Sequence, residues 1–177
     1  MPDVPTAGRA TPRAGDDEAD ADVARLYDLY AAELYRYAVI VLTDRALAED
    51  AVQQVFSKLL SSNAVRAIEL PDHYLRRAVR NECYTLLARR ASPNSGEPGR
   101  PLIEPVASAV DHDERIAIEC ALRALPVDQR EVLTLKVYEG LTFREIAELT
   151  ETPLNTVASR YRYAIDKMRA ALDARIK

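Results

Sequence analysis

Residues 140–162 read GLTFREIAELTETPLNTVASRYR, two amphipathic helical patterns separated by a short polar turn. Thr142 and Glu145 have the spacing of a capping box, in which each side chain accepts a hydrogen bond from a main-chain amide at the helix start. Pro153 suits the first turn of the second helix, where no amide donor is needed, and Thr152 is its expected cap. This layout predicts a helix-turn-helix.

The second helix of this pair combines an apolar stripe with a polar face. The stripe residues recur at steps of three and four and are expected to face inward: Leu154, Val157, Tyr161, Ile165, Met168 and Leu172. The opposite side carries amide, hydroxyl and guanidinium groups that suit a DNA groove: Asn155, Ser159, Arg162 and Arg169, with Thr156 and Arg160 beside them. The alternative is that these groups only solvate a surface helix.

Composition favours an all-α protein of one ordinary domain or two small ones, because 177 residues with 48% apolar content include five glycines and no tryptophan. We find no apolar run that could span a bilayer and no signal-peptide layout, so we expect a cytoplasmic protein without membrane insertion. Cys83 and Cys120 lack metal-ligand spacing and are expected to be buried. No catalytic set or phosphate-binding loop is present, so we predict neither an enzyme nor a bound cofactor or metal.

The net charge of −4 is unevenly distributed. Residues 1–22 hold six acidic residues against two arginines, a local charge of −4, whereas residues 154–177 hold six basic residues against two acidic ones, a local charge of +4. Because salt screens charges beyond about 8–10 Å, the basic C-terminal helix can attract phosphate despite the acidic total.

Hydrophobic periodicity and proline placement divide the chain into two helical domains. Residues 1–21 lack helical periodicity and are predicted to be a disordered tail. Helices are expected from Asp22 to about 43, from 44 to 60 and from 71 to 90, so the first domain covers 22–90. A Pro-rich linker over 91–111 precedes a second domain, 112–177, with helices near 111–124 and 128–139, the latter closed by Gly140.

The first domain shows two further polar faces. The helix over 44–60 buries Ala48, Ala51, Val52, Val55, Phe56 and Leu59 and turns outward a face that is either solvated surface or a docking site for another protein. The helix over 71–90 buries Leu75, Val79, Cys83 and Leu86 and carries several arginines with Tyr74 and Tyr84. These tyrosines are either the edge of the core or, with the arginines, a surface for single-stranded nucleic acid.

Three segments carry a resemblance to a known family: AEDAVQQVFSKLL (48–60), LPDHYLRRAVRNE (70–82) and LPVDQREVLTLKVYEGLTFREIAELTETPLNTVASRYR (125–162). In this order around a Pro-rich linker, they resemble the extracytoplasmic-function (ECF, group IV) sigma factors of bacterial RNA polymerase, over about 23–90 and 112–173. The resemblance implies a non-enzymatic subunit with sigma regions 2 and 4, which directs core polymerase to bipartite promoters and helps to melt the DNA.

The resemblance also assigns the sites. It implies that Glu49, Asp50, Gln53 and Gln54 dock on the clamp helices of the polymerase β′ subunit. The β flap is the second expected polymerase contact. It assigns promoter melting and binding of the proximal promoter element to Asn63, Arg66, Tyr74, Arg76, Arg77, Arg80 and Asn81. It assigns base recognition in the distal promoter element to Asn155, Thr156, Ser159 and Arg160, and it places Arg162 and Lys167 nearer the DNA phosphates. No sensory domain is visible, so we expect control from outside, either by an anti-sigma factor that separates or masks the two domains or by expression level.

The chain departs from the family pattern at three positions. Tyr74 replaces a frequent Trp, Ala158 a frequent Lys, and Gln54 a frequent acid, which leaves promoter sequence and strength open. Two other interpretations of the sequence assign it a different function from that of a sigma factor. One is a dimeric helix-turn-helix regulator that acts without polymerase, and the other is a sigma-like module that only binds another protein.

Overall fold

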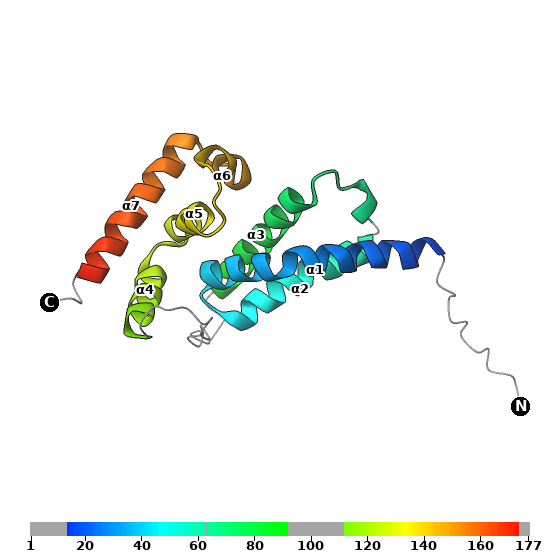
Figure 1. Cartoon of the computed structure of the whole chain (residues 1–177), viewed down its shortest axis with the longest axis horizontal. Helices are drawn as coiled ribbons and strands as arrows, with labels where there is room; N and C mark the ends of the chain where they lie inside the picture. The colour runs from blue at the N-terminus through cyan, green and yellow to red at the C-terminus, as the bar shows by residue number, and fades with distance from the viewer. Residues whose placement is uncertain (1–13, 63, 92–111, 174–177) are drawn as a thin grey trace, which may run out of the picture.

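The computed structural model describes residues 14–62, 64–91 and 112–173, and over these ranges every regular element is helical (Figure 1). The α-helices are α1 (Ala14–Leu42), α2 (Arg45–Ser62), α3 (Pro71–Arg90), α4 (His112–Ala124), α5 (Val127–Val137), α6 (Phe143–Thr150) and α7 (Leu154–Asp173), and a one-turn 3-10 helix, η1 (Ala64–Ala67), precedes α3. The predicted all-α class is confirmed. Beyond Ala91, the predicted linker lies outside the described residues.

The helices α1, α2 and α3 form an N-terminal bundle. The residues predicted to face inward on α2 and α3 are buried, as predicted. They pack against α1 through Leu34, Ala38 and Val41. Each large apolar side chain buried in this way contributes about 1.5–3 kcal/mol, which holds the polar faces of α2 and α3 in fixed orientations.

The first helix begins earlier than the sequence pattern predicted. Its start is at Ala14 rather than Asp22, so residues 14–21 are helical and do not belong to a disordered tail. Ala19 and Val23 are buried one turn apart. Their packing stabilises the added turns, because most helix stability in proteins comes from tertiary contacts rather than from local propensity.

The C-terminal bundle, α4 to α7, contains the predicted helix-turn-helix. The Thr142 hydroxyl accepts the Glu145 amide at 3.2 Å, and the Glu145 carboxylate accepts the Thr142 amide at 2.7 Å, so the capping box is confirmed. Gly140 has a φ of +69°, the left-handed conformation predicted after α5. The carbonyl of Pro153 accepts the amides of Thr156 and Val157 as α7 begins.

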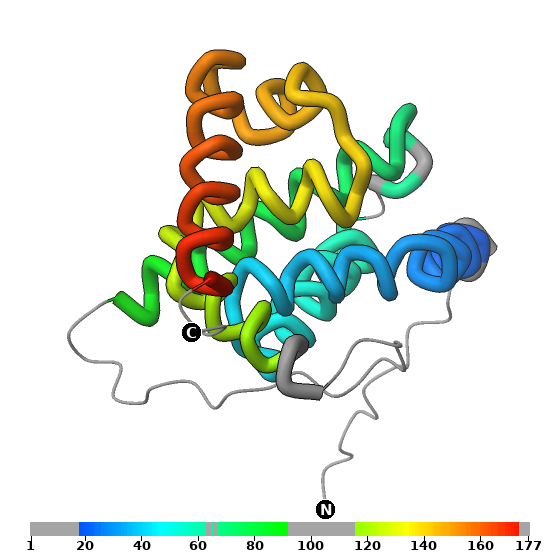
Figure 2. Tube along the Cα trace, turned by 60° about the vertical axis from the view of Figure 1, so that its left-hand side comes forward, coloured from blue at the N-terminus to red at the C-terminus, as the bar shows by residue number. Residues whose placement is uncertain are grey.

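The two bundles pack against each other, which the sequence did not predict. One cluster of buried residues extends from α1–α3 to Val132 and Leu135 of α5, Ile146 and Leu149 of α6 and Val157 of α7. In both views α5 lies between the N-terminal bundle and α7 (Figures 1 and 2). A smaller cluster joins α4, α5 and α7 through Leu122, Leu125, Leu133 and Ala164.

Three residues expected to be buried face outward instead. Cys83 is buried as predicted, but Cys120 is exposed, because α4 turns Ala121 and Leu122 inward. Leu154 is 48% exposed, because the inward side of α7 is set by Val157 and Ala164. On α1, Leu29 was expected on the apolar face but is 67% exposed. The Tyr27 ring of the same helix packs edge-to-face on Phe56, with 5.0 Å between the ring centroids.

Candidate functional site

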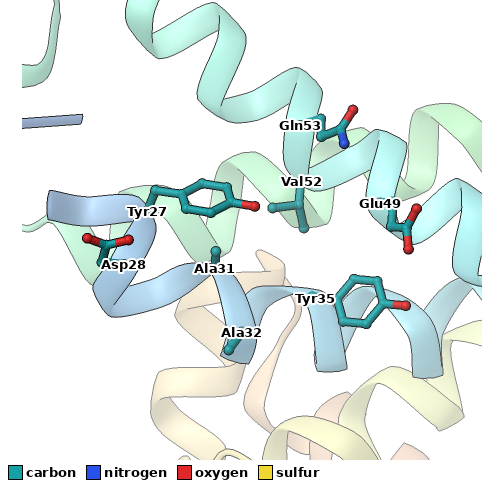
Figure 3. Close-up of a pocket in the computed structure, with 8 residues that line it drawn as sticks. All are labelled: Tyr27, Asp28, Ala31, Ala32, Tyr35, Glu49, Val52 and Gln53. Atoms are coloured by element: carbon teal, nitrogen blue, oxygen red, sulfur yellow. The ribbon is translucent and has the colours of Figure 1, made fainter. Parts of the chain in front are cut away.

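A groove between α1 and α2 contains two of the four predicted polymerase-docking residues (Figure 3). Its volume is about 380 Å³, and Glu49 and Gln53 line it from α2, one helical turn apart. The remaining lining residues are Tyr27, Asp28, Ala31, Ala32, Tyr35 and Val52. An apolar floor with carboxylates on the rim can hold apolar and basic side chains of a partner helix.

The other two docking residues, Asp50 and Gln54, lie on α2 outside this lining, with Asp50 exposed and Gln54 half-buried. The sequence did not identify the α1 side of the groove. Tyr27 and Tyr35 looked like ordinary residues of an amphipathic helix, and only the crossing of α1 with α2 shows that they face Glu49 and Gln53 (Figure 3).

Arg76 on α3 lies at the contact between the bundles, with three carboxylates around it. Its guanidinium pairs with Asp72 at 2.8 Å on its own helix, with Glu33 of α1, and with Glu139 just after α5. Glu139 is almost fully buried there, whereas Glu33 is one-third exposed. A guanidinium offers five N–H donors, so one arginine can serve all three acids.

These carboxyl groups also affect each other. Burial, followed by a hydrogen bond with Glu33, raises the pKa of Glu139 to about 7. The same hydrogen bond lowers the pKa of Glu33. Because neighbouring carboxylates do not both ionise readily, the more buried one, Glu139, retains a proton up to neutral pH.

A second cluster surrounds Glu131 of α5, whose carboxylate is inaccessible to water. Three groups of the N-terminal bundle donate to it: the Tyr37 hydroxyl at 2.7 Å, the Tyr84 hydroxyl at 2.7 Å and the Arg80 guanidinium at 2.8 Å. Burial and the Glu131 charge raise the pKa of Tyr37 and of Tyr84 above their ordinary value, so both hydroxyls remain donors. The Arg80 guanidinium also lies 4.6 Å from the Tyr84 ring centroid, a cation–π distance.

The remaining predicted melting residues are placed differently. Arg77 pairs with Glu151, which follows α6. Tyr74 and Asn81 are exposed on α3. Arg66 lies in η1 and only its backbone is described, and Asn63 lies outside the described residues. Among the predicted melting residues whose side chains are described, α3 therefore exposes Tyr74 and Asn81 while its arginines contact acids of the C-terminal bundle.

In Figure 1, α7 lies on the far side of α5 from α1 and α2. Asn155, Arg162 and Lys167 are exposed, as a DNA-reading face requires. The other predicted residues are half-buried and have partners: the Ser159 hydroxyl donates to the Thr156 carbonyl at 2.9 Å, and Arg160 pairs with Asp128 of α5 at 2.9 Å. Arg160 is thus held at the start of α7 by α5.

Arg130 is a residue of the contact between the bundles that the sequence analysis did not identify. It is buried, and it donates to the Val41 carbonyl at 2.8 Å and to the Leu122 and Arg123 carbonyls at 3.4 and 3.3 Å. Burial lowers its pKa. One guanidinium therefore bridges the C-terminal ends of α1 and α4, where helix dipoles favour a cation. Its neighbour Glu131 was missed as well, because adjacent charged residues on a short helix look like solvated surface.

Comparison with known proteins identifies both bundles. Family models for sigma-70 region 2 and sigma-70 region 4 match residues 26–92 and 115–168. The ECF RNA polymerase sigma factor SigK of Mycobacterium tuberculosis (strain ATCC 25618 / H37Rv) is 30% identical over 169 residues, which cover 90% of this chain and 89% of SigK. SigL of Mycobacterium tuberculosis (strain CDC 1551 / Oshkosh) is 30% identical over 164 residues, covering 87% and 91%.

A solved structure shows the same fold. The sigma factor RpoE from Bartonella quintana, in its complex with the anti-sigma factor NepR, matches with a TM-score of 0.67 and 21% identity, over 89% of this chain and 95% of RpoE. These matches define a two-domain protein of the sigma-70 class, with region 2 in α1–α3 and region 4 in α4–α7. The chain belongs to the ECF RNA polymerase sigma factors, which direct polymerase to promoters and are not enzymes. Among the described helices, none has the length and apolar character to cross a membrane.

Proposed function

We propose that region 2 and region 4 engage the two elements of a bipartite promoter while α2 holds the sigma factor on core RNA polymerase in the cytoplasm. The observation that carries this proposal is that three polar surfaces of different chemistry lie on three helices of one chain. The α2 surface is acidic and grooved, α3 is basic and aromatic, and α7 carries exposed amide and basic groups.

The α2 surface is proposed to bind the β′ clamp helices through Glu49, Asp50, Gln53 and Gln54. A basic side chain at Glu49 reverses the charge at the groove rim, so Glu49→Arg is expected to abolish co-elution with core polymerase in size-exclusion chromatography. Glu148→Arg makes the same charge change at an exposed α6 position and is expected to co-elute like the wild type. Co-elution of both variants with core polymerase would show that α2 is not part of the polymerase interface.

The α7 face is proposed to enter the major groove of the distal element. Asn155 and Ser159 are assigned to base edges and Lys167 to phosphate, which predicts different losses. Asn155→Ala is expected to relax base preference at one position by about 1–3 kcal/mol. Lys167→Ala is expected to weaken binding to all sequences equally and to reduce the salt dependence. Equal behaviour of the two variants on a panel of single-base substitutions contradicts the assignment.

The α3 surface is proposed to hold the melted strand near the start site, with Tyr74 stacking on an extruded base. Stacking of one base on an aromatic side chain contributes about 1–3 kcal/mol. Tyr74→Ala is therefore expected to reduce open-complex formation, measured by permanganate footprinting, by about 5- to 150-fold. Tyr74→Trp provides a larger ring and is expected to restore it.

Two further partners belong to the proposal: the β flap of polymerase, bound by region 4, and an anti-sigma factor, by analogy with the RpoE–NepR complex. The decisive experiment is in vitro transcription with core polymerase on a fragmented genomic library, followed by start-site mapping. Initiation at a set of promoters that share two spaced elements is the expected result. Tight dimeric binding to duplex DNA without any polymerase-dependent initiation overturns the proposal.

A further inference from the structure

We propose that the N-terminal turns of α1, residues 14–23, hold η1 in position and thereby set the base preference of the chain at the proximal promoter element. The inference rests on the proposed function, in which region 2, with Arg66 of η1, engages that element. It assigns a positioning role to Ala19 and Val23, which themselves contact no DNA.

The N-terminal turns of α1 are buried on one side, although the sequence pattern predicted a tail up to residue 21. Ala19 is 4% exposed and Val23 is 3% exposed. Their spacing of four residues places both side chains on one face of the helix. The side chains next to Ala19, Glu18 and Asp20, are exposed. Another part of the chain therefore covers the face that carries Ala19 and Val23.

The pairing of α1 with α2 indicates which segment lies over this face. The two helices are antiparallel, because only two residues join them, and the Tyr27 ring packs on Phe56. Ala19 precedes Tyr27 by eight residues, and η1 begins at Ala64, eight residues after Phe56. Eight residues span about 12 Å along an α-helix. Ala19 and the start of η1 therefore lie at the same level of the antiparallel pair.

The contacts of the fold agree with this register. α1 contacts η1. Ala19 and Val23 belong to the same cluster of buried side chains as Val65 of η1, and Ile68 packs against that cluster. In Figure 1 the N-terminal end of α1 runs on past the start of α3. The added turns of α1 thus form part of the surface on which η1 rests.

η1 depends on such a surface for its position. A single 3-10 turn has little stability of its own, because few hydrogen bonds offset the entropy of ordering it. The Ile68 amide donates to the Val65 carbonyl at 3.3 Å, and the Val65 side chain is 8% exposed. Arg66 directly follows Val65 in the chain. The buried Val65 side chain therefore fixes where the backbone of Arg66 lies.

The charge of the N-terminal turns argues against direct DNA binding by these turns. Glu18 and Asp20 are exposed acids, and Asp22 pairs with Arg25 at 3.5 Å. Proteins bind the DNA backbone by neutralising phosphates with basic groups, and acidic groups oppose this. The turns can therefore contribute to promoter recognition through the placement of η1, but not through a phosphate contact of their own.

The size of the expected effect follows from the energetics of base recognition. One well-placed contact to a base edge discriminates against the wrong base by about 5- to 150-fold. A looser η1 loses part of this discrimination, because the contact depends on the position of the donor. Docking through α2 and distal-element binding through α7 do not depend on η1 and are expected to remain unchanged.

The first test is run-off transcription by the holoenzyme on a panel of templates, each with one base of a mapped proximal element replaced. For each position, the initiation rate on the original template is divided by the rate on the altered one. Val23→Ala is expected to lower this ratio at least about fivefold at one or more positions. Val23→Ile keeps the apolar contact and is expected to retain the wild-type ratios.

Two controls separate packing from other changes in the same helix. Leu29→Ala shortens an apolar side chain of α1 that is 67% exposed, and it is expected to leave every ratio unchanged. Glu18→Gln combined with Asp20→Asn removes two charges from the N-terminal turns and is likewise expected to leave the ratios unchanged. Relaxed base preference in the charge variant would overturn a role that acts through packing.

The ratio also separates positioning from a general loss of stability. A variant that is only less stable initiates less on every template, and its ratios stay as in the wild type. A second panel with altered distal elements provides the internal comparison. Unchanged ratios for folded Val23→Ala, or equal relaxation at both elements, overturn the proposal. Ala19→Gly removes one methyl group and weakens only the end of α1, so it replaces Val23→Ala if that variant does not fold.

The opposite side of the contact gives an independent check. Val65→Ala is expected to relax the same positions of the proximal element as Val23→Ala. The double variant is expected to relax them no further than either single change, because both disturb one contact. Relaxation at different positions, or additive losses, would contradict a shared contact.

Amide hydrogen exchange of residues 64–70 in the free full-length chain tests the packing without DNA. Val23→Ala is expected to speed this exchange by about tenfold, because two methyl groups leave the buried contact, whereas Leu29→Ala is expected to have no effect. Unchanged exchange in Val23→Ala overturns the positioning role. Absence of initiation by the wild type on every promoter overturns the proposed function, while faster exchange in Val23→Ala still shows that α1 holds η1.

Discussion

Replacing Tyr37 with Phe removes one hydroxyl from the contact between the bundles and leaves the packing volume unchanged. The Tyr37 hydroxyl donates to Glu131 at 2.7 Å, and both side chains are buried. A hydrogen bond to a charged group contributes about 1.5–3 kcal/mol. Because Glu131 keeps its bonds from Arg80 and Tyr84, we expect Tyr37→Phe to lower the free energy of unfolding by about 2 kcal/mol.

Urea unfolding followed by far-UV circular dichroism measures this loss, and for a chain of this size it corresponds to a fall in melting temperature of about 4–8 °C. Tyr138→Phe is the control, because Tyr138 is exposed, and its stability should change by less than about 0.5 kcal/mol. In a double-mutant cycle with Glu131→Gln, the two changes should not be additive, since Tyr37→Phe removes a hydrogen bond that Glu131→Gln has already weakened by removing the charge of its acceptor. Additive effects, or a Tyr37→Phe variant as stable as the control, would refute the assigned link between region 2 and region 4.

Thr142→Ala removes one half of the capping box and is expected to cost about 1 kcal/mol in urea unfolding; an unchanged midpoint contradicts the cap. The raised pKa of Glu139 means that the packed state holds a proton that the separated state releases, so between about pH 4.5 and 7 the contact weakens as pH rises. The lowered pKa of Glu33 acts in the opposite direction, but only below its ordinary value near 4.5. The pH dependence of urea unfolding between pH 5 and pH 8 should therefore contain a loss of stability that Glu139→Gln removes. Cys120 should react with a maleimide within minutes in the folded protein, whereas Cys83, buried and with its pKa raised to about 12, should react only on unfolding; equal reaction rates contradict the assigned burial.

Local sequence patterns determined most of the secondary structure and one face of each helix. The capping box at Thr142, the left-handed Gly140 and the inward stripes of α2 and α3 were all predicted, because each depends on residues within about one turn of one another. The exposed amide and basic groups of α7 follow from the same periodicity. Errors occurred where a neighbouring helix decides orientation, as at Cys120 and Leu154.

The partners of the α3 arginines were decided only by the tertiary structure. The sequence placed Arg76 and Arg80 on a basic helix and assigned them to DNA. Their partners lie far along the chain, because Glu139 is 63 residues after Arg76 and Glu131 is 51 residues after Arg80. Helical periodicity carries no information about which distant carboxylate a guanidinium meets, since that depends on how two bundles joined by a linker dock. The sequence by itself determined that this chain is a two-domain sigma factor, and the packing of α5 against α1 and α3 decided which of its binding groups are exposed.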